Sequence, residues 1–128
     1  WMDQNDAARK ALTTSKGEAL DVALDMFIGA FKWKDATVWA NGIDFDCTIL
    51  EEAMKATGRA VPWAYWSKMD FRTVQNLAPR DVYNACKVEN PIKHNALADA
   101  TAQAATLINL QQAMSFGMPV AAKKKKAV

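Results

Sequence analysis

The sequence has few of the residue types that mark specialised classes of protein. Its two cysteines, Cys47 and Cys86, lack CxxC spacing, which argues against a cysteine-based zinc site and against a disulfide framework. No apolar run approaches the ~18 residues of a membrane span, and the first residues do not form a basic stretch followed by an apolar one. We therefore expect a cytoplasmic protein with neither a membrane partner nor a signal peptide.

The remaining composition is that of one soluble globular domain, with 51% hydrophobic and 23% charged residues in 128. The formal net charge of +2 depends on Lys123 to Lys126, because without them twelve basic residues face fourteen acidic ones. A protein that coats nucleic acid along its whole surface is therefore not expected. We divide the chain into a domain over residues 1–114 and a Lys-rich tail over 115–128. The tail is interpreted as a solvated end, with a salt-sensitive contact to phosphate as the alternative.

Apolar periodicity and turn residues predict a helix-rich α/β chain. The predicted helices span residues 7–12, 18–33, 46–58, 71–78 and 95–114, and the predicted strands are short, at 36–40 and 65–69. Residues 80–93 are expected to form a loop in which Pro91 holds Asn90 extended. Because two short strands rarely make an independent sheet, we expect a fold whose first strands are absent from this sequence.

Two helices carry more specific expectations. Thr48 and Glu51 have the spacing of a capping box near the start of the predicted 46–58 helix. The last helix should begin at an Asn95 cap and bury one face. The residues of that face are Leu97, Ala100, Ala104, Leu107, Ile108 and Leu110.

Two carboxylates, Asp44 and Asp46, lie between the first predicted strand and the following helix. The carboxyl end of a strand is where open α/β sheets place their ligands, so Asp46 is a candidate site residue. The alternative is a helix cap, in which Asp44 or Asp46 accepts a backbone N–H at the helix start. Asn41 and Gly42, taken alone, are typical turn residues.

The chain has one histidine, His94, and it precedes the predicted last helix. Five residues of helix turn through about 140°, so His94 and Asp99 could not share a face within one helix. With Asn95 as the cap, however, His94 lies in the incoming loop and can turn toward Asp99. Any imidazole general base must be this residue. The alternative is a surface histidine beside a capped helix.

The motifs N-x-x-x-F-D at residues 41–46 and H-x-A-x-x-D at residues 94–99 together resemble the DEDD superfamily of 3′–5′ exonucleases. The resemblance is to its histidine-containing branch (DEDDh, DnaQ-like and RNase T-like), and above all to bacterial and phage 3′–5′ exoribonuclease-type enzymes. It covers about residues 1–114, including the aromatic stretch PWAYWSKMDFRTVQNL. It implies an α/β, ribonuclease H-like fold.

The resemblance also implies roles for individual residues. Asp46 and Asp99 would hold two divalent cations, Mg²⁺ or Mn²⁺, and His94 would act as the general base in phosphodiester hydrolysis. The nucleotide would be contacted by Asn41, by Phe45 and by Arg72, for which a surface ion pair is the alternative. The implied partner is the 3′ end of single-stranded RNA or DNA.

The family's first motif, an Asp-x-Glu on the first strand, occurs nowhere in this chain. Together with the start at Trp1, this leads us to expect a piece of a longer protein that does not cleave nucleic acid by itself, unless a pair such as Glu51 and Glu52 replaces the motif. Unpaired strand edges leave homo-oligomer formation open. Two further hypotheses are a catalytically silent nucleic-acid-binding or assembly module derived from this fold, and a helical structural domain with accidental motif matches.

Overall fold

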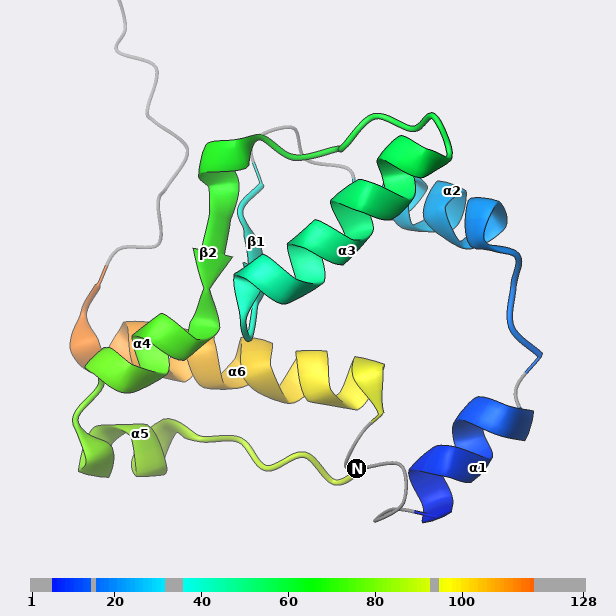
Figure 1. Ribbon diagram of the computed structural model, residues 1–128. Helices are drawn as coiled ribbons and strands as arrows, with labels where there is room; N and C mark the ends of the chain where they lie inside the picture. Colours follow the sequence, from blue (N-terminus) through cyan, green and yellow to red (C-terminus); the bar gives the residue numbers. More distant parts are fainter. Residues whose placement is uncertain (1–5, 15, 32–35, 93–94, 117–128) are drawn as a thin grey trace, which may run out of the picture.

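The computed structural model describes residues 6–14, 16–31, 36–92 and 95–116. Helices dominate this part of the chain, and two short strands lie between them (Figure 1). In chain order the elements are α1 (Asp6–Thr14), α2 (Leu20–Ala30), β1 (Val38–Ala40), α3 (Ile43–Ala56), the 3₁₀ helix η1 (Tyr65–Ser67), β2 (Lys68–Asp70), α4 (Phe71–Leu77), α5 (Arg80–Cys86) and α6 (Ala96–Met114). No described helix is long and apolar enough to cross a membrane.

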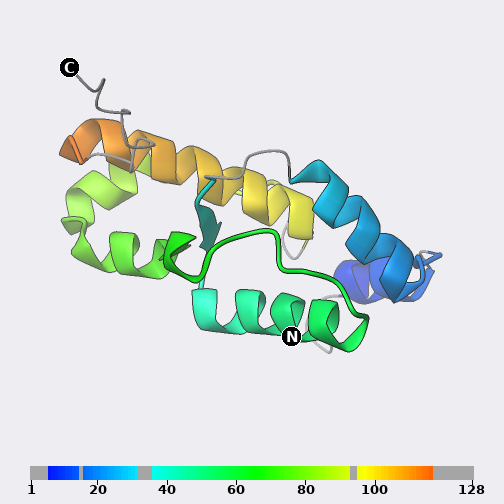
Figure 2. The same cartoon turned by 90° about the horizontal axis from the view of Figure 1, so that it is seen from above.

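The two strands form a parallel pair in which Val38 is opposite Lys68 and Ala40 is opposite Asp70. Figure 2 shows α3 and α6 on opposite sides of β1. Since the strands are parallel, the chain leaves both of them at the same end of the sheet, so the start of α3 and the start of α4 lie together. The predicted helix-rich α/β class is confirmed, whereas the ribonuclease H-like assignment stays a prediction.

Two small apolar clusters form the core. One joins α2, α3 and the segment before β2, through the buried side chains of Leu24, Cys47, Met54 and Trp63. The other joins α4, α5 and α6, through Phe71, Cys86, Leu107 and Leu110. Val38 packs on the first cluster and Trp39 on the second, so strand β1 lies between the two.

The predicted loop over residues 80–93 is wrong for its first half, because Arg80–Cys86 forms α5. The helix is too short to show clear periodicity, and it is stabilised by contacts outside itself. Val82 and Tyr83 pack on the second core cluster, and the Asn109 side chain of α6 donates to the carbonyl of Cys86 at 3.0 Å. Such contacts with a distant helix have no signal in the local sequence.

Other boundaries differ by a few residues. The second strand was predicted over residues 65–69, but Tyr65–Ser67 forms η1 and the strand follows at Lys68–Asp70. Helix α2 ends at Ala30, and the rest of the predicted 18–33 helix, from residue 32, lies outside the described residues.

Of the six residues predicted for the inner face of α6, two are buried and four are exposed. Leu107 and Leu110 are buried, but Leu97 and Ile108 are 78% and 48% exposed. The residues of α6 that belong to the second cluster lie toward its C-terminal end, so its first turn does not pack on that cluster. The Asn95 cap is confirmed, since its side chain accepts the N–H of Ala98 at 3.0 Å.

Candidate active site

Helix α3 begins earlier than predicted, and neither Asp44 nor Asp46 caps it. The helix starts at Ile43, and Gly42 is its N-cap residue with φ +101°, a backbone conformation that favours glycine. Asp44 and Asp46 both lie in the first turn and are exposed. The predicted capping box also fails, because Thr48 and Glu51 lie inside the helix.

The cap of α3 comes from Asp70, a residue that the sequence reasoning missed. Its Oδ1 accepts the N–H groups of Gly42 at 2.9 Å and of Ile43 at 3.2 Å. Its Oδ2 accepts the N–H of Thr73 at 2.9 Å and the Thr73 hydroxyl at 2.8 Å, which caps α4. One carboxylate therefore joins the starts of two helices. The D-x-x-T spacing of residues 70–73 was a signal for the α4 cap alone.

These hydrogen bonds favour the ionised form of Asp70. Partial burial by itself would raise its pKa, but the bonds from Gly42, Thr73 and Ile43 outweigh that effect and lower the pKa from 3.8 to about 2. Asp70 is therefore a carboxylate throughout the physiological range. Its charge holds the turn at residues 41–43 in place beside the end of β2.

Asp46 and Asp99 line the same hollow, of about 450 Å³, although they come from different halves of the chain. We call it the central hollow. Asp46 enters it from the first turn of α3 and Asp99 from the first turn of α6. Its lining consists of Phe27, Val38, Trp39, Ala40, Asn41, Asp46, Cys47, Leu50, Ala96, Asp99, Ala100 and Gln103. The wall is mainly apolar, and burial raises the pKa of the Cys47 thiol, which keeps it neutral.

The three predicted nucleotide contacts line a second, adjoining hollow of about 690 Å³, here called the nucleotide hollow. Asn41 belongs to the walls of both hollows. Phe45 is 71% exposed at its edge, and the Arg72 guanidinium donates from Nη2 to the Asn41 carbonyl at 3.3 Å. No ion pair of Arg72 occurs among the described residues, so the surface ion pair considered as its alternative is not observed.

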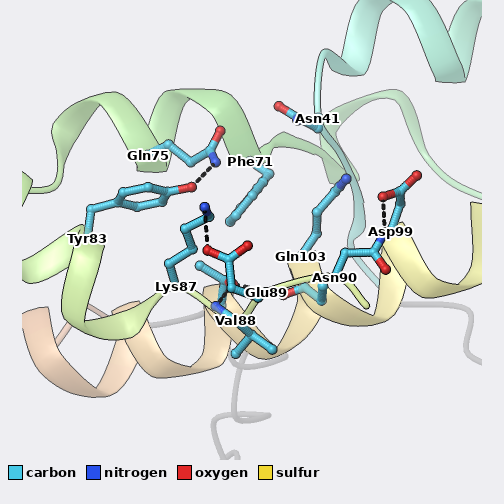
Figure 3. Close-up of a pocket in the computed structure, with 12 residues that line it drawn as sticks. Asn41, Phe71, Gln75, Tyr83, Lys87, Val88, Glu89, Asn90, Asp99 and Gln103 are labelled. Atoms are coloured by element: carbon cyan, nitrogen blue, oxygen red, sulfur yellow. Dashed lines mark hydrogen bonds and ion pairs between the residues drawn. The ribbon is translucent and has the colours of Figure 1, made fainter. Parts of the chain in front are cut away.

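A third hollow, of about 240 Å³, opens between α4, α5 and α6 and is here called the side hollow (Figure 3). It shares Asn41, Asp99 and Gln103 with the central hollow. Two pairs of its polar side chains interact: Gln75 donates to the Tyr83 hydroxyl at 2.8 Å, and Lys87 pairs with Glu89 at 2.7 Å. Asn90 donates to the carboxylate of Asp99 across its edge.

The donor set of the central hollow fits a hard cation in part. Asp46 and Asp99 offer the carboxylate oxygens that Mg²⁺ and Mn²⁺ prefer. Within the described ranges there is no group of three or more His, Cys, Asp and Glu residues suited to a metal ion. His94, the predicted base, lies outside the described residues.

Glu51 and Glu52, considered as a replacement for the missing motif, take other partners. Glu51 Oε1 accepts the Trp63 indole N–H and the Lys68 ammonium, both at 3.0 Å. These bonds, from Trp63 first and then Lys68, lower the pKa of Glu51. Glu52 pairs with Lys55 on the exposed face of α3. Neither glutamate lines the central hollow.

Comparison with known protein families identifies the family of the chain. The model of the Rv2179c-like domain, described as a 3′–5′ exoribonuclease domain, matches residues 1–111. The chain belongs to this family. Its members are nucleases, so the predicted 3′–5′ exonuclease family is confirmed and RNA is the substrate that the family name implies. No curated protein and no solved structure matches the chain.

Proposed function

We propose that this chain provides the metal-binding and nucleotide-binding residues of a metal-dependent 3′–5′ exonuclease of the DEDDh type, with a ribonuclease H-like fold. The supporting observation is that Asp46 and Asp99 line one hollow, beside Asn41, in a chain of an exoribonuclease family. The substrate is the 3′ end of a single-stranded nucleic acid, with RNA favoured over DNA by the family name.

Asp46 and Asp99 would hold divalent cations, Mg²⁺ or Mn²⁺, two of them in the complete site. Bound ions of this kind stabilise charge on the attacking and leaving oxygens of a phosphodiester. Among the described residues that line the central hollow, these two aspartates are the only charged ones, so they are the groups that would attract a cation to it.

The nucleotide is held from the adjoining hollow. Phe45 is exposed and can stack on the terminal base, an interaction worth about 1–3 kcal/mol that tolerates any base. Arg72 brings a cation to a phosphate, and its bond to the Asn41 carbonyl orients it toward the nucleotide hollow. His94 takes the proton from the attacking water, a role that suits a side chain titrating near neutrality.

Single substitutions in the full-length protein test this assignment. Asp46→Asn, Asp99→Asn and His94→Ala should each lower turnover of a single-stranded RNA by about a hundredfold or more. Asp81→Asn is the matched control, since Asp81 is an exposed carboxylate in the first turn of α5 and lines none of the three hollows.

The result also separates this function from its rival, a silent nucleic-acid-binding module. An Asp46→Asn protein with ordinary kinetics would refute the metal assignment. A full-length protein that binds single-stranded RNA tightly but leaves it intact in Mg²⁺ and in Mn²⁺ would establish the rival function.

A further inference from the structure

The segment that follows α5 is fixed to α6 over several residues. The N–H of Val88 donates to the Thr106 hydroxyl of α6 at 2.9 Å, and Thr106 is buried. Two residues before it, the carbonyl of Cys86 accepts from Asn109 of the same helix. The backbone of the segment therefore has a defined position against α6, and this places Asn90 in the lining of the side hollow.

The orientation of the Asn90 amide is fixed by its two partners. Its oxygen accepts the backbone N–H of Ile92 at 2.8 Å. An N–H group can bond only to the oxygen, so the nitrogen of the amide must face the other way. There it donates to Oδ1 of Asp99, the contact drawn as a dashed line in Figure 3.

We propose that Asn90 is a positioning residue for Asp99, holding its carboxylate in one rotamer at the mouth of the central hollow. The proposal rests on the function proposed above in taking Asp99 as a metal ligand. Asn90 occupies one lone pair of Oδ1, and no hydrogen bond to Oδ2 occurs among the described residues. A carboxylate held in this way loses less rotamer freedom when it binds a cation than one that is free to turn.

A role for Asn90 in positioning Asp99 gives a function to Pro91 and to the hydrogen bond from the Ile92 N–H. Pro91 restricts Asn90 to an extended backbone, and the Ile92 N–H orients the Asn90 amide. Both constraints come from residues that follow Asn90 in the chain. The anchor of Val88 on Thr106 acts from the N-terminal side. Asp99 is thus held by a residue that is itself held at both ends.

Manganese affinity measures this role. In a Mn²⁺ titration of the full-length protein, followed by electron paramagnetic resonance of the free ion, Asn90→Ala should weaken binding about tenfold or more. Asn109→Ala is the control, because it removes one hydrogen bond between α6 and the end of α5 but does not touch Asp99. Equal Mn²⁺ affinity in Asn90→Ala and in the parent would overturn the proposal, and so would an equal loss in both variants.

A metal-free measurement distinguishes failure of this proposal from failure of the proposed function. The side-chain NH₂ protons of Asn90, observed by NMR in the chain without metal, should exchange several times faster with solvent in Asp99→Ala and unchanged in Asp46→Ala. Unchanged exchange in Asp99→Ala would refute the contact. A parent protein that binds no Mn²⁺ would refute the metal role of Asp99, and the exchange rates would then decide the Asn90 contact alone.

Discussion

Loss of the Asp70 carboxylate should destabilise the chain by an amount that its pKa sets. In Asp70→Asn, one oxygen remains for four donors, and an NH₂ group faces two of them. The pKa lowered from 3.8 to about 2 corresponds to at most roughly 2.4 kcal/mol of preference for the charged form. Because Asp70 is partly exposed, we expect a smaller loss, of about 1–2 kcal/mol, in the free energy of unfolding.

The loss should depend on pH in one direction. The pKa of Asp70 is lower in the folded chain than in the unfolded one, so its stabilisation is complete above about pH 4 and disappears as the pH falls toward 2. The difference in stability between parent and Asp70→Asn should therefore be constant from pH 5 to 7 and shrink below pH 4.

Urea unfolding followed by tryptophan fluorescence measures both quantities, since the chain has five tryptophans. Asp81→Asn is the control and should stay within about 0.5 kcal/mol of the parent. A stability difference of the same size at pH 2.5 and pH 7 would show that shape rather than charge is responsible. No difference at pH 7 would refute the role of Asp70 altogether.

Three further predictions concern the turn before α3, the Lys-rich tail and the activity of the isolated chain. Gly42→Ala should lower the free energy of unfolding by about 1–2 kcal/mol, because φ is +101° and the new Cβ would lie 3.2 Å from Arg72 Nη2. Gly29→Ala, inside α2 with open space around it, should raise the free energy of unfolding slightly. A Gly42→Ala protein more stable in urea than Gly29→Ala would contradict the account. Deleting residues 123–126 should weaken RNA binding modestly and flatten its salt dependence; abolished cleavage at saturating RNA would place the tail in the site. The 128-residue chain alone should leave a labelled single-stranded RNA intact in millimolar Mg²⁺, because the described lining of the central hollow has two carboxylates and a two-metal site uses about four. Shortening from the 3′ end that is lost in His94→Ala would refute this.

Features that depend on neighbouring residues were predictable from the sequence. Helix α6 follows an Asn95 cap and runs to Met114 as expected, since both signals lie within the helix and the residue before it. The position of Asn41 directly after β1 was also readable, because a strand and the turn residues that follow it are adjacent in the chain, whereas its role at a nucleotide stays a prediction.

Features that depend on distant partners were not predictable. Helix α3 begins three residues earlier than expected because its cap is Asp70, 28 residues from Gly42 in the chain. Helix α5 was missed since the side chain that bonds its last carbonyl belongs to Asn109. Asn90 was noted only for its extended backbone, and its contact with Asp99 appears only once α6 is folded against the segment.

The central claim is that Asp46 and Asp99 act together on one substrate in the central hollow. A double-mutant cycle in the full-length protein tests it most directly, with turnover of a 5′-labelled single-stranded RNA in Mg²⁺ as the readout. We predict that Asp46→Asn and Asp99→Asn each slow stepwise shortening from the 3′ end about a hundredfold or more, and that the double variant is scarcely slower than either single one. Losses that multiply in the double variant would mean that the two carboxylates act independently, and this would contradict the account.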